Sequence, residues 1–156
     1  GHGNVVDPCF DGTAEWNAFW DPEAVKRVWD SSLEIHMVGL ESTEELPLTR
    51  DLCQHWAELR RYPAIDLIGQ GYALVLNVAA NNVYYLWDVL TTVYCLHPEI
   101  AEVERARCDV RVDGAAAGRT FRCDEGREVT LVTHADPERF YALVDELAMS
   151  AAPALY

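Results

Sequence analysis

The sequence predicts an α/β fold that is mostly helical, with a few strands and a small β segment near the C-terminus. Apolar residues at helical spacing dominate the middle of the chain, from residue 44 to residue 100. A short apolar run at residues 33–40 closely follows a helix pattern, which is typical of a buried strand in an α/β layer. The 156 residues suffice for one domain with a core, so we expect residues 1–156 to form a single unit.

The first helix is predicted at "DPEAVKRVWDS", residues 21–31. Asp21 can cap this helix, Pro22 suits its first position, and the charge of Glu23 complements the helix dipole. The run "LEIHMVGL", from Leu33 to Leu40, is then expected to form a buried strand.

Residues 44–80 are expected to be mostly helical. One helix start is indicated at residues 43–47 and a second at Thr49, and Pro63 separates two helices. A further helix is predicted within residues 84–100, where Pro98 closes a run of apolar residues at helical spacing.

The C-terminal part changes character. Residues 106–114 alternate as a strand, and residues 118–136 are predicted to form a hairpin-like pair of strands around Asp124–Gly126. Residues 136–152 form an amphipathic helix pattern with Pro137 near its start. These C-terminal elements carry no functional signal, and we expect them to serve packing.

The composition of the chain limits the kinds of partner that it is expected to bind. The net charge is −14, from 26 acidic and 12 basic residues, which argues against nucleic acid and anionic membranes as main partners. The chain has no apolar run of about 18 residues or more, and its first residues lack the pattern of a signal peptide. Its five cysteines are scattered and contain no C-x-x-C pair. We therefore expect a cytoplasmic protein with no membrane partner.

Asp88 stands out in "NNVYYLWDVL", residues 81–90, because it is the one carboxylate in an aromatic and apolar run. A buried carboxylate costs several kcal/mol unless it is paired, protonated or bound to a metal. The helix pattern places Asp88 on a first turn, where the helix dipole favours a negative charge and a ligand can approach.

A second candidate site lies in "GNVVDPCFDGTAEWNAFWDPEA", residues 3–24. If this segment is extended, Glu15 and Asn17 point to the same side and together present a carboxylate and an amide. Such a pair can bind vicinal hydroxyl groups. Asn4, eleven residues before Glu15, could join them across the loop. The alternative is a polar loop with an Asx turn at Asp11–Gly12.

Together these stretches resemble the nucleoside hydrolases, and most closely their inosine-adenosine-guanosine-preferring branch. The family pattern A-E-F/W-N followed by D-P-x-A is matched at residues 14–17 and 21–24, and "YYLWDVLTTVY" follows in the right order. The resemblance covers nearly the whole chain but only the C-terminal half of the family's domain. It implies the C-terminal part of an open, Rossmann-like α/β domain.

The resemblance also implies roles for individual residues. Asn4 and Glu15 match residues that hold the ribose 5′-hydroxyl, and Asn17 matches one that holds the other ribose hydroxyls. Trp16 belongs to the same substrate-binding motif. Trp87 matches a tryptophan that stacks on a purine, where the pyrimidine-tolerant branch has a histidine, and Asp88 matches a late calcium ligand. The implied reaction is the calcium-dependent hydrolysis of purine nucleosides to base and ribose.

The sequence departs from the family in one large respect. It lacks the D-x-D-x-x-x-D-D cluster that supplies most calcium ligands and the base that activates water, so its catalytic residues are unknown. Three interpretations follow. The chain is half of an enzyme, completed by a missing N-terminal half or a second subunit in a homodimer. It is a non-catalytic nucleoside-binding or subunit-pairing remnant. Or the match misleads, and the chain is an independent acidic α/β domain.

Overall fold

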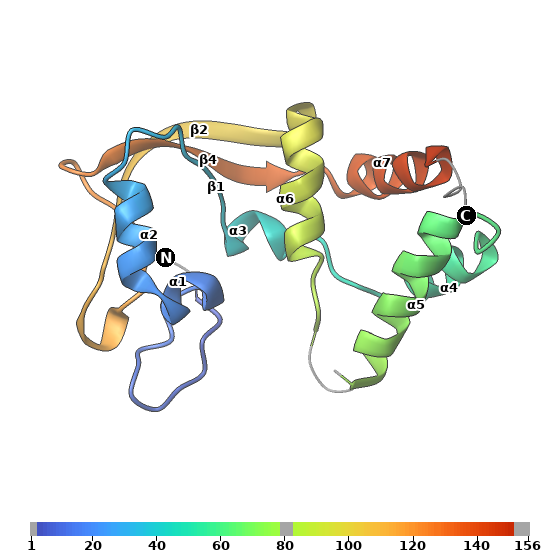
Figure 1. Ribbon diagram of the computed structural model, residues 1–156, viewed down its shortest axis with the longest axis horizontal. Coiled ribbons are helices and arrows are strands. Elements are labelled where there is room, and N and C mark those ends of the chain that lie inside the picture. Colours follow the sequence, from blue (N-terminus) through green and yellow to red (C-terminus); the bar gives the residue numbers. More distant parts are fainter. Residues whose placement is uncertain (1–2, 79–82, 152–156) are drawn as a thin grey trace. The chain divides into compact units, whose positions relative to one another are not determined.

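The computed structural model describes residues 3–78 and 83–151 (Figure 1). The chain divides into two compact units, each formed by two stretches of sequence. The first unit comprises residues 1–42 and 102–134, and the second comprises residues 43–101 and 135–156. Helices and strands occur together, which confirms the predicted α/β class.

The first unit contains a sheet of four strands in the order β1-β4-β2-β3. β1 pairs with β4 in parallel, and β2 pairs with β3 in antiparallel orientation. The strands are β1 (His36–Val38), β2 (Ala101–Val110), β3 (Thr120–Arg122) and β4 (Arg127–Ala135). The helical elements are α1 (Trp16–Trp20), α2 (Pro22–Trp29), α3 (Leu40–Thr43) and the 3-10 turn η2 (Gly114–Ala116).

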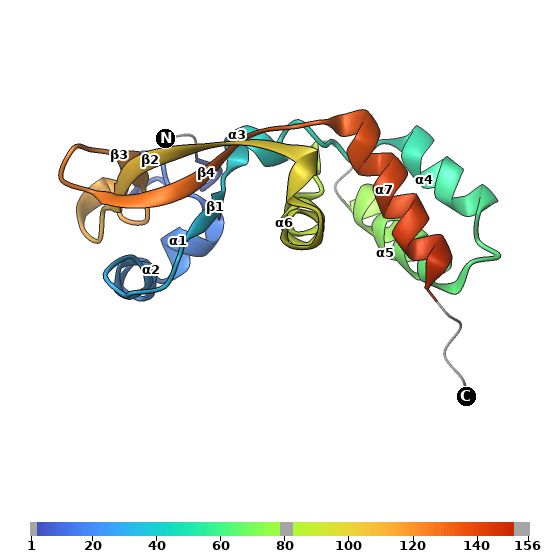
Figure 2. The same cartoon turned by 90° about the horizontal axis from the view of Figure 1, so that it is seen from above.

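Helix α2 lies against the sheet (Figure 2). Its predicted start is confirmed, because the Asp21 carboxylate accepts a hydrogen bond of 2.9 Å from the Ala24 N–H and Pro22 is the first helical residue. Trp29, on the last turn, is 6% exposed and packs into an apolar cluster with strand residues. That cluster consists of Trp29, Ala106, Cys108, Val110 and Val129, with Val25, Ile35, Met37 and Leu131 packed around it.

Two strand predictions for this unit need correction. The run Leu33–Leu40 yields only the three-residue β1, whose residues are exposed or half-buried, and Leu33 is 62% exposed. β1 lies at the edge of the described sheet and pairs with β4 alone, so one strand covers it rather than two. The hairpin predicted around Asp124–Gly126 is also wrong, since β3 and β4 are not neighbours and β2 lies between them.

The second unit is mainly helical. Its helices are α4 (Arg50–Glu58), α5 (Pro63–Val78), α6 (Trp87–Leu96) and α7 (Pro137–Ser150), with the 3-10 turn η1 (Pro98–Ile100). α5 packs against both α4 and α7, and Trp56, Ile65 and Phe140 are almost fully buried among the helices. None of the helices in the described stretches combines the length and apolar character that a membrane span needs.

The helix starts predicted at Thr49 and Pro63 are confirmed, and the Thr49 hydroxyl accepts a hydrogen bond of 3.1 Å from the Leu52 N–H. The start predicted at residues 43–47 is wrong. The Leu48 N–H donates to the Tyr84 carbonyl at 2.8 Å, and the Leu86 N–H donates to the Leu46 carbonyl at 3.0 Å. This pairing places Pro47 in an antiparallel bridge with Tyr85 and excludes a helix at residues 46–48. Residues 79–82, where the predicted helix would end and the quoted stretch at 81–90 begins, lie outside the described residues.

Candidate functional site

Glu15 and Asn17 lie together at the start of α1. Glu15 is the N-cap: its Oε2 accepts hydrogen bonds from the Asn17 N–H at 3.0 Å and from the Ala18 N–H at 3.2 Å. Its Oε1 accepts a hydrogen bond of 3.0 Å from the Asn17 side-chain amide. The segment is therefore helical from Trp16 onward, and the extended conformation predicted from sequence is wrong. The adjacent carboxylate and amide nevertheless leave lone pairs and N–H groups that can meet hydroxyl groups.

Asn4 is tied to this motif through the backbone. The Asn4 N–H donates to the Ala14 carbonyl at 3.1 Å, directly before Glu15. The approach is so close that a Cβ atom on Gly3 would lie 2.4 Å from the Gly12 carbonyl oxygen. Glycine at position 3 is thus a steric requirement for bringing exposed Asn4 beside the start of α1.

The loop between Asn4 and Glu15 contains the predicted Asx turn. The Asp11 Oδ1 accepts hydrogen bonds from the Thr13 hydroxyl at 2.6 Å and the Thr13 N–H at 3.0 Å, and Gly12 has a φ of +75°. These hydrogen bonds, led by that from the Thr13 hydroxyl, hold the pKa of Asp11 below its ordinary value. The Asx turn and the polar pair thus coexist, and the turn shapes the loop that leads into the motif.

Trp16 is 51% exposed and meets Trp20 edge to face, with ring centroids 5.4 Å apart. Trp20 is 66% exposed. The two indoles are four residues apart on α1, which places them on one helix face. Trp20 was missed from the sequence, although the i, i+4 spacing of two tryptophans beside the motif could have indicated it.

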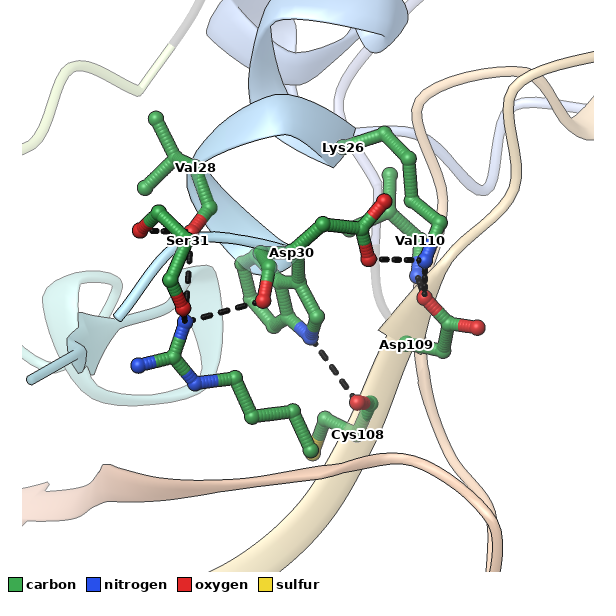
Figure 3. A network of polar contacts seen from close by, with 9 residues as sticks. Lys26, Val28, Asp30, Ser31, Cys108, Asp109 and Val110 are labelled. Carbon is green, nitrogen blue, oxygen red and sulfur yellow. Dashed lines mark hydrogen bonds and ion pairs between the residues drawn. The ribbon is translucent and has the colours of Figure 1, made fainter. Parts of the chain in front are cut away.

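Helix α2, which follows α1 directly, is anchored to β2 by polar contacts. Lys26 donates from its ammonium to the carboxylates of Asp30 at 2.7 Å and Asp109 at 3.0 Å, and Figure 3 shows it between the two. The Trp29 indole N–H donates to the Cys108 carbonyl at 2.8 Å in a buried position. The bonds to Asp109 and Cys108 hold α2 on β2.

Arg127, at the start of β4, binds the end of α2. Its guanidinium donates to the carbonyls of Val28, Trp29, Ser31 and Leu33. Helix C-termini leave carbonyl groups without partners, so a guanidinium placed there satisfies them and complements the helix dipole. The α1–α2 segment that carries Glu15 and Asn17 is therefore held at its far end.

Trp87 and Asp88 belong to the second unit, where they are the first two residues of α6. This confirms the helix and the first-turn position predicted for Asp88. Asp88 itself is exposed, while the buried face of α6 is formed by Leu90, Val93 and Tyr94. The expectation that Asp88 lies in an apolar wall is thus wrong for this unit, because it projects from the opposite face of the helix.

The Trp87 side chain is half-buried and packs against two tyrosines. Its ring centroid lies 4.6 Å from that of Tyr84 and 5.8 Å from that of Tyr85, both nearly edge to face. Within the described part of the chain, its buried indole N–H has no hydrogen-bond partner. A ligand with an acceptor atom could supply one.

The aromatic cluster continues into the unit. The Tyr72 ring lies 6.2 Å from Tyr84 and 5.9 Å from Trp56. Burial, followed by the nearby Tyr84 and the negative charge of Asp88, raises the pKa of Tyr72. Tyr72 and Tyr84 were not singled out from sequence, and only the adjacent "YY" before Trp87 hinted at an aromatic platform.

A metal ion would find few ligands here. Among residues 3–78 and 83–151, no group of three or more His, Cys, Asp or Glu side chains is placed to hold an ion. Ca²⁺ takes six to eight oxygen ligands, so Asp88 alone does not make a calcium site.

Comparisons with known proteins identify the family. The sequence model of the family described as "Inosine-uridine preferring nucleoside hydrolase" matches residues 1–142 of this chain. The chain therefore belongs to the nucleoside hydrolase family. This confirms the resemblance to nucleoside hydrolases at the level of the family, and it excludes the interpretation as an unrelated acidic domain.

Two relatives named "Inosine-uridine preferring nucleoside hydrolase" match 65% of this chain. The one from Leishmania major is 28% identical over 104 residues, and the one from Crithidia fasciculata is 29% identical over 107 residues. Each alignment spans 33% of the relative.

Solved structures match more of the chain. An inosine-uridine preferring nucleoside hydrolase from Bacillus anthracis has a TM-score of 0.87 and 44% identity over 96% of this chain and 48% of its own. A purine-preferring ribonucleoside hydrolase from Gardnerella vaginalis has a TM-score of 0.74 and 23% identity over 96% of this chain and 50% of its own. At this identity the match shows a similar fold only. The chain thus spans about half the length of these structures.

Proposed function

We propose that this chain supplies the ribose- and base-binding part of a nucleoside N-ribohydrolase that cleaves purine nucleosides to base and ribose. The family is that of nucleoside hydrolases, and the observation that carries the proposal is the Glu15–Asn17 pair beside Asn4. The corresponding polypeptide in the relatives is about twice as long. We therefore assign this chain substrate binding and place the activation of water in the part that it does not match.

Ribose binding is assigned to the first unit. The Glu15 carboxylate already organises α1 and can accept a further hydrogen bond from a sugar hydroxyl, while the Asn17 amide can both donate and accept. In this proposal Glu15 and Asn4 hold the 5′-hydroxyl, and Asn17 holds the other ribose hydroxyls. Binding energy from hydroxyls away from the reacting C1′ can orient the sugar and favour its oxocarbenium-like state.

Base binding is assigned to Trp87 in the second unit, with Trp16 contributing an exposed aromatic surface at the ribose motif. An indole offers a large flat surface, and stacking on a base contributes about 1–3 kcal/mol. A tryptophan at position 87, rather than a histidine that could protonate the leaving base, is our reason for proposing purine nucleosides as substrates. Tyr84 and Tyr85 support the indole from the side.

In this proposal the chain supplies one ligand to a calcium ion, the carboxylate of Asp88. Asp88 is exposed at a helix N-terminus and is suited to contribute one carboxylate ligand to a hard cation. The remaining ligands must come from outside the described residues, so we assign to this chain no step that depends on the ion. The additional ligands would come from a missing N-terminal half or from a second subunit in a homodimer.

The edge of the sheet is consistent with such a partner. β1 is short, ends the strand order, and is preceded by Leu33, which is 62% exposed. An edge strand beside exposed apolar residues is a site where another strand can pair. The second candidate function, a non-catalytic nucleoside-binding or subunit-pairing remnant, is favoured by the absence, among the described residues, of a group of metal-ligating side chains around Asp88.

Calorimetric titration of the purified chain with inosine, 5′-deoxyinosine and uridine tests the binding proposal. We expect inosine to bind more tightly than 5′-deoxyinosine, because the 5′-hydroxyl meets Glu15 and Asn4, and more tightly than uridine, because Trp87 covers a purine. Glu15→Gln keeps an oxygen that can cap α1 but removes the charge, so it should reduce the preference for the 5′-hydroxyl to the part that Asn4 supplies. Glu23→Gln, in the exposed first turn of α2, is the matched control. Equal binding of inosine and 5′-deoxyinosine by the unaltered chain would refute the ribose assignment.

A further inference from the structure

We infer that Gly118, in the connection between β2 and β3, is a positioning residue for the ribose-binding motif. The contact between Gly118 and α1 is given by the structure alone, whereas its effect on inosine binding rests on the proposed function. The connection comprises residues 111–119 and lies far from α1 in the sequence. Its own sequence gave no indication of a function. It nevertheless touches both the loop that precedes Glu15 and the helix that carries Asn17.

Two contacts join the connection to the motif. The Asp11 N–H donates to the Ala115 carbonyl at 2.9 Å, which ties the connection to the loop before Glu15. Gly118 then packs against the backbone of α1: a Cβ atom added to it would lie 2.7 Å from the carbonyl carbon and oxygen of Ala18 and from the Cα of Phe19. Ala18, the residue after Asn17, is only 6% exposed.

The size of the displacement follows from this distance. Real Cβ atoms almost never come closer than 3.0 Å to another heavy atom, and ordinary contact begins at 3.4 Å, so a methyl group at position 118 requires a movement of about 0.3–0.7 Å. The atoms in the way are backbone, which cannot rotate aside as a side chain can. Either α1 or the connection must therefore shift, and α1 carries the Glu15–Asn17 hydrogen bonds.

The same connection supplies a matched control. Gly118 has a φ of +89° and Gly114 has a φ of +71°, so alanine is strained at both positions. A Cβ atom on Gly114, however, meets no atom within 4 Å. Gly114→Ala thus reproduces the backbone strain without the collision with α1, and the difference between the two variants isolates the contact.

The test compares Gly118→Ala and Gly114→Ala by NMR and by titration with inosine. Gly118→Ala should shift the Asn17 backbone and side-chain amide signals and the Ala18 amide signal, whereas Gly114→Ala should leave them unchanged. The dissociation constant for inosine should rise about tenfold in Gly118→Ala and less than about twofold in Gly114→Ala, since a displacement of several tenths of an ångström is costly at a positioned site. Thermal unfolding of both variants measures the strain that they share.

The outcomes separate the two claims. Unchanged Asn17 signals in Gly118→Ala, or equal changes in both variants, would overturn the inference. If Gly118→Ala does not fold, nuclear Overhauser cross-peaks between the α-protons of Gly118 and Phe19 in the unaltered chain decide it, and their absence would refute the contact. If the unaltered chain does not bind inosine, the proposed function fails while the amide signals still decide the role of Gly118.

Discussion

Replacing Trp29 by Phe should destabilise the first unit strongly, because the indole combines apolar packing with a buried hydrogen bond. Trp29 is 6% exposed and its N–H donates to the Cys108 carbonyl at 2.8 Å. Leaving that carbonyl without its donor costs about 1–3 kcal/mol. The smaller ring leaves a void that costs about another 1 kcal/mol. We therefore expect a loss of roughly 2–4 kcal/mol in the free energy of unfolding.

Urea unfolding followed by far-UV circular dichroism measures this loss without relying on tryptophan fluorescence. The expected decrease corresponds to a melting temperature roughly 5–12 °C lower for a chain of this size. Trp20→Phe is the control, since Trp20 is 66% exposed and its replacement should change stability by less than about 0.5 kcal/mol. Equal effects of the two substitutions would refute the account of how α2 is held on the sheet.

Three further changes test other parts of the molecule. Trp87→Leu should weaken inosine binding roughly ten- to hundredfold while leaving the affinity for free ribose unchanged, as titration with both ligands would reveal. Asp145→Ala should lower the melting temperature by several degrees, because the Asp145 carboxylate accepts a hydrogen bond of 3.0 Å from a buried indole of α4, whereas exposed Glu146→Ala should not. Burial is the largest single influence on Asp109 and would raise its pKa, but the hydrogen bonds from Lys26 and the Val110 N–H and the nearby positive charges together outweigh it, so the pKa is lowered. The charged Asp109 therefore stabilises the fold above its ordinary pKa of about 4, and this contribution is lost as pH falls through the lowered value. Asp109→Asn should flatten that acid dependence of the urea midpoint, and an unchanged slope would contradict it.

Local signals in the sequence predicted the starts of α2, α4 and α7. Asp21 and Thr49 cap α2 and α4, and Pro137 is the first residue of α7; a capping side chain binds an N–H only two or three residues away, so such signals are local. Glu15 was not recognised as a cap because glutamate is not among the preferred N-cap residues. Its place beside Asn17 was predicted, but for an extended segment rather than for a helix start.

Features that depend on distant partners were not predictable from one sequence. Residues 46–48 looked helical but pair with residues 84–86, and β2 separates two strands that looked like a hairpin. The exposure of Asp88 depends on which face of α6 is buried. The aromatic residues before Asp88 do not follow a clear helical period, so the sequence did not indicate that face. The contact of Gly118 with α1 joins segments 100 residues apart, so no local pattern could indicate it.

The most direct test of the central claim is release of ribose from inosine by this chain combined with a separately produced polypeptide that covers the unmatched half of the relatives. With Ca²⁺ present, we predict ribose release by the mixture, little release by either part alone, and loss of activity with Asp88→Ala. If the two parts are folded and associated but the mixture releases no ribose, the claim that this chain is the substrate-binding half of an enzyme is contradicted. Inosine binding without turnover would then favour the non-catalytic remnant.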